Sequence, residues 1–532
     1  MPEIFTLLPP VVAILLAFIT KNVLFSLFIG VLTGTYLISL HSHGFILSFF
    51  YGFLEVINMI LSSLADPWNA GVILQCLTIG GLIALISKMG GAKAIAESLS
   101  KKAKSAKSTQ LITWVLGLFV FFDDYANSLI VGPIMRPVGD KMKISREKLA
   151  FIIDATAAPI AGIAIISTWI GYEISLIKDG YASIGQTVNA YEVFIQTIPY
   201  RFYNIFIMAF IILTAVLARE FGPMLKAEKR ARNLGKVLAD DAKPLLSTEN
   251  SSIQEKEGIK LSIWNAIIPI SSLIIFAFLG FYYSGYTEIM SGDELELIEM
   301  IKNSPLAFST LREIFGASDA SIVLFQAAFL ASIIAIVMAV SQRIMGIGEA
   351  IDTWLEGVKS LIITGAILLL AWSLSATIKE LGTASYLASI LSGTLPSFLL
   401  PSLIFVLGAV ISFATGTSYG TMGILMPLVI PLANTMSSDP TLITISIGAV
   451  LTGAIFGDHC SPISDTTILS SMGAMCDHLH HVKTQLYYAI TVGIVTVVAG
   501  YLPVALGIPV WISLSLGIIS CFLLVRFVGK PV

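Results

Sequence analysis

Residues 456–467 read Phe-Gly-Asp-His-Cys-Ser-Pro-Ile-Ser-Asp-Thr-Thr and continue an apolar run that begins at residue 441. An ionisable side chain within a membrane span costs several kcal/mol, from about 2.5 kcal/mol upward, so Asp458 and Asp465 are functional candidates by default. Pro462 lacks a backbone N–H and favours a break in the helix between them. Four hydroxyl side chains accompany the carboxylates: Ser461, Ser464, Thr466 and Thr467. The stretch therefore predicts a broken transmembrane helix that concentrates oxygen ligands.

The composition of the whole chain is that of a membrane protein. Charged residues make up 12% of the 532 residues and hydrophobic residues 56%, whereas soluble domains are typically about 25% charged. These values exclude an ordinary soluble enzyme. The formal net charge of −3 leaves no basic surplus for a phosphate backbone, so we expect no nucleic-acid partner. The four cysteines form no CxxC pair, and we interpret them as buried thiols.

Apolar runs recur along most of the sequence at the length that a bilayer requires, which is about 20 residues per helix. The N-terminus lacks the basic region of a cleaved signal, so we expect the first run to remain as a membrane span. Together with the interrupted stretches, the runs predict an all-α polytopic membrane protein with roughly 11 to 13 spans. Runs are found near 4–20, 23–40, 71–87, 149–170, 194–217, 262–283, 319–340, 360–377, 402–414, 441–456, 485–505 and 508–526.

Basic residues gather in three segments, at 101–107, 136–148 and 226–243. Lys and Arg of short loops mark the cytoplasmic side of a membrane protein. All three segments are therefore predicted to be cytoplasmic, which places the loops 171–192 and 284–318 outside. With the span count above, the N-terminus is expected outside and the C-terminus in the cytoplasm.

The chain contains an internal repeat, and a repeat of this kind determines the architecture of the fold. Three blocks of the first half match blocks of the second half in the same order. The matched blocks are 90–100 with 382–392, 115–135 with 406–426, and 158–167 with 461–470. Counting of crossings makes the two halves opposite in orientation, provided that 45–64 and 343–358 lie along the membrane. Inverted repeats with helices broken near the midplane are typical of secondary transporters.

The repeat divides the chain into four parts. Repeat 1 is expected over 1–219 and repeat 2 over 261–505, and each contains a broken or re-entrant hairpin. A charged cytoplasmic linker is predicted at 220–260, and 506–532 forms an additional C-terminal span. The two hairpins are predicted at about 109–140 and about 396–436.

The first half carries its own polar residues within apolar stretches. Asp123 and Asp124 interrupt an apolar run, Asn127 lies one helical turn after Asp123, and Asp154 precedes Thr156. The corresponding hairpin of the second half carries hydroxyls in their place: Thr417 and Ser418. Carboxylate, hydroxyl and carbonyl oxygens suit hard cations such as Na⁺ or Li⁺. No cluster of thiols or imidazoles at ligand spacing supports a transition metal.

The histidines differ in their sequence context. His459 lies between Asp458 and Cys460 in the broken helix, so it is a candidate participant in proton transfer. A second group precedes Lys483 in a segment expected to be cytoplasmic, and a solvated turn is the favoured interpretation for it. That group consists of His478, His480 and His481.

These motifs resemble the NhaC family of bacterial sodium/proton antiporters. The resemblance rests on the run from Phe456 to Thr467, on Ala414 to Gly423, and on the Asp123-Asp124-Tyr-Ala-Asn127-Ser stretch. It implies exchange of Na⁺ for H⁺ across a bacterial inner membrane by a carrier, not an enzyme, that is usually dimeric. It implies no cofactor beyond the transported ions, and membrane lipid as the surroundings.

Competition between a cation and protons for one carboxylate cluster is sufficient for exchange. Asp458 and Asp465 are the first choice for the competing pair and, with Asp154, for Na⁺ binding. Asp154 and Asp123 are expected as partners across the repeat interface, with Asp124 tuning their charge. Because such groups titrate together, the proton cannot be assigned to one of them from the sequence.

Two other functions stay open on the sequence alone. A carrier of a small organic solute, such as an amino acid or a carboxylate like malate or lactate, could be driven by H⁺ or Na⁺. A carboxylate substrate would need a cationic group or helix N-termini at the midplane, and no Lys or Arg falls clearly within a predicted span. A membrane-embedded hydrolase would need a nucleophile and a base in contact, which only His459 with Ser461 or Ser464 offers.

Overall fold

The computed structural model describes the chain almost throughout and is helical. It describes residues 3–20, 22–121, 124–165, 167, 169–244, 256, 258–292, 295–383, 386, 396–437, 439–462 and 464–532. Its first half comprises η1 (Glu3–Leu7), α1 (Leu8–Thr20), α2 (Val23–Ser39), α3 (Phe45–Ala65), α4 (Pro67–Lys88), α5 (Gly91–Ser100), α6 (Ala106–Phe119), α7 (Asp124–Lys141), α8 (Arg146–Ala155), α9 (Ala158–Ala161), α10 (Ile170–Ser183), α11 (Ala190–Thr197), η2 (Ile198–Tyr200), α12 (Phe202–Leu217), β1 (Arg219–Glu220) and α13 (Gly222–Leu234).

The second half has a similar series of helices. It comprises α14 (Trp264–Ser291), α15 (Leu295–Asn303), α16 (Phe308–Gly316), α17 (Ala320–Ser341), α18 (Ile347–Ser360), α19 (Ile362–Leu381), η3 (Ser397–Leu399), α21 (Leu400–Thr415), α22 (Ser418–Met436), α23 (Pro440–Cys460), α24 (Asp465–Ala474), α25 (His478–Val495), η4 (Thr496–Tyr501), α26 (Leu502–Ala505), α27 (Val510–Leu523), η5 (Leu524–Val528) and β2 (Lys530–Pro531).

The helices confirm the predicted polytopic membrane fold. Among the described residues, nine helices are long and apolar enough to cross a membrane, or ten if the bent pair 190–200 and 202–217 forms one span. Two apolar helices near the N-terminus are shorter than such a span. Several of the expected membrane spans are not among these nine helices, because breaks divide them into shorter helices.

Four helices end where the sequence predicted breaks. The first hairpin is interrupted between α6 and α7, and the second between α21 and α22, where Gly416 has a φ of +69° that suits glycine. Helix α8 ends at the C-cap Thr156 shortly before Pro159, and α23 ends at the C-cap Ser461 directly before Pro462. The elements of the two halves therefore occur in the same order, each with a broken hairpin followed by a broken helix.

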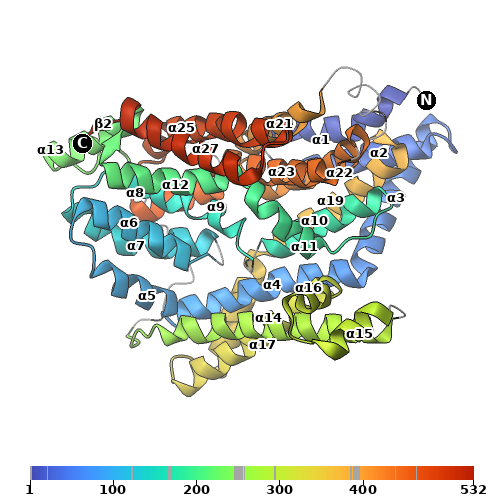
Figure 1. Ribbon diagram of the computed structural model, residues 1–532, viewed down its shortest axis with the longest axis horizontal. Helices are drawn as coiled ribbons and strands as arrows, with labels where there is room; N and C mark the ends of the chain where they lie inside the picture. Colours follow the sequence, from blue (N-terminus) through green and yellow to red (C-terminus); the bar gives the residue numbers. More distant parts are fainter. Residues whose placement is uncertain are drawn as a thin grey trace.

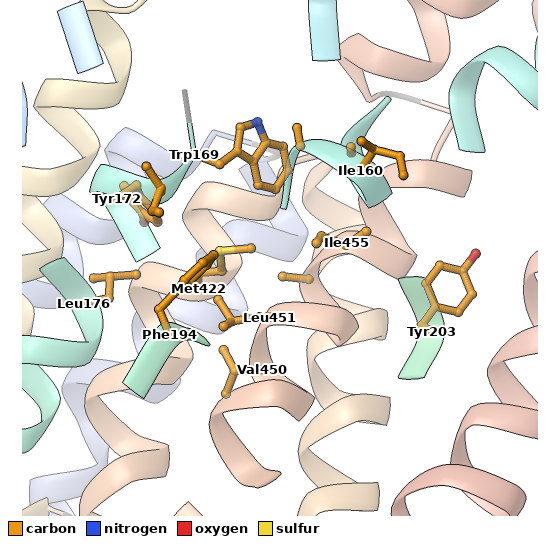
Figure 2. Close-up of a cluster of buried hydrophobic side chains, with 14 of the residues drawn as sticks. Ile160, Trp169, Tyr172, Leu176, Phe194, Tyr203, Met422, Val450, Leu451 and Ile455 are labelled. Carbon is orange, nitrogen blue, oxygen red and sulfur yellow. The ribbon is translucent and has the colours of Figure 1, made fainter. Parts of the chain in front are cut away.

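The halves pack reciprocally around these breaks. Helix α24 lies against α7 and α8 of the first half, whereas α10 lies against α22 and α9 against α23. A cluster of large apolar side chains fills the space between α9, α10, α11, α22 and α23 (Figure 2). Ile160, Trp169, Met422 and Leu451 in this cluster are almost fully buried. Such close packing closes one flank of the interface to water.

The basic segments lie together at one end of the molecule. The backbone N–H of Arg146 donates to the Val237 carbonyl, and that of Ser145 donates to Glu228. The C-terminal β2 pairs with β1 beside α13, at the left in Figure 1, while the N-terminus lies at the right. This grouping is what the positive-inside prediction requires.

Of the segment 171–192, which was predicted as an outer loop, residues 171–183 form the largely buried helix α10 instead. The part after α10 meets the other predicted outer segment, 284–318, which contains α15 and α16. The Asn189 side chain, in the loop after α10, donates to the Phe315 carbonyl at the end of α16 over 3.4 Å. In Figure 1, α15 lies at the right, away from α13 and the C-terminus. Helix α3, which was expected along the membrane, is one of the nine helices long and apolar enough to cross it, and only 17% of its apolar window is buried. In Figure 1 it runs steeply at the right, at a clear angle to α4.

Candidate functional site

Asp458 lies in the last turn of α23, and two hydroxyls hold its carboxylate. Ser418 Oγ, at the start of α22, donates to Oδ2 over 2.7 Å, and Ser464 Oγ, beyond the helix break, donates to Oδ1 over 2.5 Å. The side chain is 6% exposed. The broken second hairpin and the broken α23 therefore meet on this one carboxylate, which brings three of the candidate residues, Asp458, Ser418 and Ser464, into contact.

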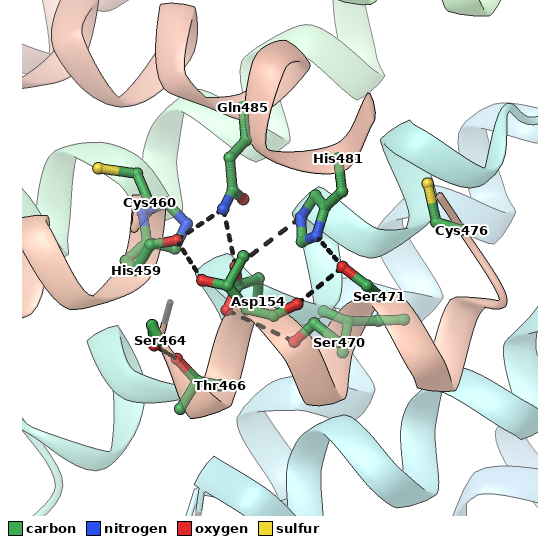
Figure 3. Close-up of polar contacts among 12 residues, drawn as sticks. Asp154, His459, Cys460, Ser464, Thr466, Ser470, Ser471, Cys476, His481 and Gln485 are labelled. Atoms are coloured by element: carbon green, nitrogen blue, oxygen red, sulfur yellow. Dashed lines mark hydrogen bonds and ion pairs between the residues drawn. The ribbon is translucent and has the colours of Figure 1, made fainter. Parts of the chain in front are cut away.

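Asp154 is the corresponding carboxylate of the first half, and it is fully buried in the last turn of α8. Gln485 Nε2 of α25 donates to its Oδ2 over 2.9 Å, and the Ser470 hydroxyl of α24 lies 3.4 Å from its Oδ1 (Figure 3). Among the described residues, no Lys or Arg forms an ion pair with Asp154. Residues of the second half thus surround a buried acid of the first half.

The two carboxylates belong to one polar network. Gln485 Nε2 also donates to the His459 carbonyl over 2.7 Å, next to Asp458 in the chain. Thr467 Oγ1 lies 3.4 Å from the Asp458 carbonyl. Neutral side chains donate to both buried acids, and a cation or protons can compensate their negative charge.

Asn127 closes the break of the first half. Its Nδ2 donates to the Gly117 carbonyl of α6 over 3.0 Å and to the Thr156 carbonyl at the end of α8 over 2.7 Å. Its Oδ1 is buried and has no hydrogen-bond partner. Because a buried amide oxygen without a partner costs free energy, this oxygen is a candidate ligand for a cation.

The other hydroxyls predicted for the site face backbone carbonyls or each other. Thr156 Oγ1 donates to the Ile152 carbonyl over 2.8 Å, and Ser461 Oγ donates to the Phe413 carbonyl over 2.7 Å. The hydroxyls of Thr466 and Ser464 are 2.9 Å apart. Each oxygen that donates its proton keeps lone pairs for a cation.

The remaining predicted residues lie at the helix starts. Asp124 begins α7 and is buried, and Thr417 is the N-cap of α22. Asp465 begins α24, but its side chain lies outside the described part of the structure, as does Asp123. The pairing of Asp458 with Asp465 stays a prediction.

His459 is buried beside the site. Its Nδ1 lies 2.9 Å from the Tyr203 hydroxyl of α12, and its Nε2 is buried without a hydrogen-bond partner. The histidines of α25 correct the expectation of a solvated turn. His481 is fully buried with Nε2 3.8 Å from Asp154 Oδ2, because α25 begins at His478 and carries the fourth helical position inward to α8.

A buried ion pair corrects a second expectation, that no Arg or Lys falls within a span. Arg201 lies at the bend between η2 and α12, fully buried, with Nη2 2.8 Å from Glu173 Oε2. Its other donors contact Thr197 Oγ1 and the Gly162 carbonyl. The position was missed because the apolar run 194–217 continues through it and a single charge hardly lowers the mean hydropathy.

Sequence reasoning also missed the neutral members of the network, namely Ser128, Tyr203, Ser470, Ser471 and Gln485. Serine and tyrosine are common in spans without a function, so they give no signal on their own. The repeat offered one signal, since it aligned Ser470 with Ser167. Helical spacing offered another, since His481 and Gln485 are four residues apart and share a face.

The donor set is one of oxygens. Among the described residues, no three His, Cys, Asp or Glu side chains lie in an arrangement that could hold a metal ion. Carboxylates, hydroxyls and an amide oxygen suit a hard, weakly held cation better than a transition metal. The same carboxylates can take up protons.

Comparison with known proteins agrees with this architecture. An uncharacterised protein of Haemophilus influenzae is 34% identical over 504 residues, 94% of this chain and 91% of that protein. The Na⁺/H⁺ antiporter NhaC of Alkalihalophilus pseudofirmus is 31% identical over 150 residues, 28% of this chain and 30% of its own length. The malate-2H⁺/Na⁺-lactate antiporter of Bacillus subtilis is 32% identical over 181 residues, 33% of this chain and 36% of its own.

Among solved structures, the YdaH transporter of Alcanivorax borkumensis has the same fold, with a TM-score of 0.55 at 15% identity over 86% of this chain and 90% of that chain. The model of the Na⁺/H⁺ antiporter family matches residues 2–164 and 160–502. These matches confirm the resemblance seen in the motifs, and the chain, a multi-pass membrane transporter, belongs to the Na⁺/H⁺ antiporter family.

Proposed function

We propose that this transporter exchanges Na⁺ for H⁺ at the network that joins Asp154 and Asp458. One observation carries the proposal: two buried carboxylates, one at each broken helix, each accept hydrogen bonds from neutral side chains. An excess of buried negative charge is stable only when a cation or protons compensate it. Na⁺ and H⁺ therefore compete for the same oxygens, and this competition couples their movements.

The surrounding groups would serve both loaded states. Ser418 and Ser464 donate hydrogen bonds to an ionised Asp458 when a cation is present, and can accept one when it is protonated. Asn127 Oδ1 adds a neutral oxygen. Li⁺ has the same preference for hard oxygen ligands and is expected to be a second substrate.

Movement of one repeat against the other would open the site alternately to the two sides. The site lies where the broken segments of one half pack on the other half, so a rocking motion changes the access and the ligand distances together. In this proposal the two parts that move against each other are repeat 1, residues 1–219, and repeat 2, residues 261–505. We place the transporter in a bacterial inner membrane, with the linker 220–260 and the C-terminus in the cytoplasm, and as a homodimer.

Transport of an organic solute is the alternative, since one relative is named a malate-2H⁺/Na⁺-lactate antiporter. A carboxylate solute would need a cationic partner in the membrane. Arg201 is buried, but its guanidinium already contacts Glu173, Thr197 Oγ1 and the Gly162 carbonyl. This arrangement disfavours a carboxylate substrate and leaves Na⁺ as the preferred one.

Purified protein in proteoliposomes with an internal pH dye tests the proposal. Gradients of Na⁺, Li⁺, K⁺, malate, lactate and arginine are imposed in turn. We expect proton flux with Na⁺ and Li⁺ and none with K⁺, and loss of the flux in Asp458→Asn and Asp154→Asn. Asp240→Asn is the matched control, because Asp240 pairs with Lys236 on the exposed linker.

Flux that appears only with an organic solute would replace the proposal by a coupled solute carrier. Sodium-driven flux that persists in both site variants would move the exchange to other residues, with Asp465→Asn as the next variant to measure.

A further inference from the structure

A row of side chains leads from Asp154 to the end of α25 that lies near the linker. His481 Nδ1 is 2.8 Å from Ser471 Oγ of α24, and the same Ser471 Oγ is 3.1 Å from His478 Nδ1. His478 Nε2 in turn contacts the Pro462 carbonyl over 2.7 Å. His481 is fully buried and His478 is half-buried. The row therefore begins on the buried carboxylate and ends near the surface.

The hydrogen bonds define the proton positions along the row. The Pro462 carbonyl only accepts, so His478 carries a proton on Nε2, and a neutral His478 ring has a bare Nδ1. Ser471 has one hydroxyl proton, which it donates to the Thr467 carbonyl over 2.8 Å, so Ser471 Oγ accepts the Nδ1 proton of His481, and its own proton can turn to His478 Nδ1, 3.1 Å away, during transfer. A neutral His481 is therefore left with an unprotonated Nε2, which faces Asp154 and has no hydrogen-bond partner among the described residues.

We propose that His481, Ser471 and His478 form a proton relay that connects Asp154 with the aqueous phase on the linker side. This rests on the exchange function proposed above and assigns the route of its proton. The relay residues do not bind the cation. They move the proton that the cation displaces.

The steps balance in protons. When Na⁺ enters, Asp154 gives its proton to His481 Nε2, and the imidazolium passes its Nδ1 proton to Ser471 Oγ. Ser471 gives its own proton to His478 Nδ1, and His478 releases its Nε2 proton to water. One proton leaves Asp154 and one enters the solvent. Between transfers the Ser471 hydroxyl donates its proton to the Thr467 carbonyl, 2.8 Å away.

The gap between His481 Nε2 and Asp154 Oδ2 is the point where the relay can be interrupted. At 3.8 Å it exceeds a hydrogen bond, so transfer requires that the two side chains approach or that one water bridges them. Asp154 belongs to α8 of the first half and His481 to α25 of the second. Rocking of the halves would therefore open and close the relay together with the cation site.

The charged surroundings favour the outer end of the row as a proton exit. Asp477 precedes His478 and accepts the backbone N–H of the linker residue Lys243 over 2.8 Å. His480 Nε2 lies 3.7 Å from Asp241 of the linker. Arg146 of α8 contacts the Ala474 carbonyl at the end of α24. His480 is on the surface beside the row, without a contact to Ser471 among the described interactions, and so provides a matched control.

The test measures proton release and Na⁺ binding separately on full-length protein in proteoliposomes. We expect His481→Gln and Ser471→Ala to slow Na⁺-driven proton flux by roughly 10²-fold, the size of a lost proton-transfer group. Half-saturating Na⁺ should stay within about twofold of wild type, since neither residue binds the ion. His480→Gln should behave as wild type. Added imidazole should restore flux in His478→Ala, because that position is half-buried, and not in Ser471→Ala.

The outcomes separate this proposal from the exchange function. Wild-type protein without Na⁺-driven flux removes both. Wild-type flux with equal flux in His481→Gln and Ser471→Ala overturns the relay and leaves the exchange intact. If His481→Gln does not fold, Ser471→Ala, which removes one hydroxyl, decides alone. If Ser471→Ala loses both Na⁺ affinity and proton flux, Ser471 belongs to the cation site, and this outcome would contradict the relay.

Discussion

A buried ionised side chain needs a partner of opposite charge close to it, and the pair of Arg201 with Glu173 is an example. Both side chains are fully buried, and their nearest charged atoms are 2.8 Å apart. The desolvation of each ion is offset only by the other and by hydrogen bonds to Arg201. In the described part of the chain no Lys or Arg pairs with Asp154, and we propose that a transported ion compensates its charge. The contrast separates a structural charge from a functional one.

Glu173→Gln should therefore destabilise the protein by about 3–5 kcal/mol, because it leaves a buried guanidinium uncompensated. Thermal unfolding of the purified protein in detergent measures the effect. Asp240→Asn breaks an exposed pair with Lys236 and should leave the unfolding temperature unchanged. Equal unfolding temperatures for Glu173→Gln and wild type would show that the pair contributes nothing to stability.

At this scale the sequence predicted charges better than neutral groups. Asp154 and Asp458 were predicted because a carboxylate within an apolar run has few structural explanations. Gln485 and Ser470 were not, because neutral polar residues are tolerated in spans and their role depends on which helix faces them. His481 was misassigned because helix α25 begins three residues before it, and only the helix turns the ring inward.

Helices α21 and α23 show how elements position the site. They lie side by side along their length, and glycines of α23 allow the approach. A Cβ atom at Gly457 would lie 2.3 Å from the Phe413 backbone N, and one at Gly453 2.6 Å from the Phe405 carbonyl oxygen. This contact aligns Asp458 with Ser418 across the second hairpin. Glycine at these two positions therefore permits the close packing of the helices.

Gly457→Ala should separate α21 from α23 by a few tenths of an ångström or more, since overpacking forces the backbone to shift, and cost about 1–3 kcal/mol. We expect a lower unfolding temperature and weaker Na⁺-driven flux. Gly408→Ala is the matched control on α21, because its Cβ would meet its nearest atom at an ordinary 3.4 Å. Flux and stability that are equal in Gly457→Ala and Gly408→Ala would contradict this account of the interface.

The whole molecule has two chemically different ends. The basic segments, α13 and the C-terminus lie at one end, and α15 with the loop after α10 at the other (Figure 1). The sequence predicted this separation from charge alone, because Lys and Arg determine insertion. It could not predict which side chains of one half would face the breaks of the other, since that depends on the fit between the two halves.

Cysteine labelling in vesicles of known orientation tests the sidedness. Lys236 of the linker and Leu306 between α15 and α16 are both exposed, and the native cysteines are buried, so their background is low. A membrane-impermeant maleimide should label Lys236→Cys only from the cytoplasmic side and Leu306→Cys only from the outside. Labelling of both positions from one side would contradict the topology.

The central claim is that Na⁺ displaces protons from one shared network. Proton release from purified, weakly buffered protein on addition of NaCl measures this displacement most directly. We expect saturable proton release with Na⁺ and none with choline. The release should be lost in Asp154→Asn and in Asp458→Asn. Asp240→Asn should release protons as the wild-type protein does. Saturable Na⁺ binding without any proton release would contradict it.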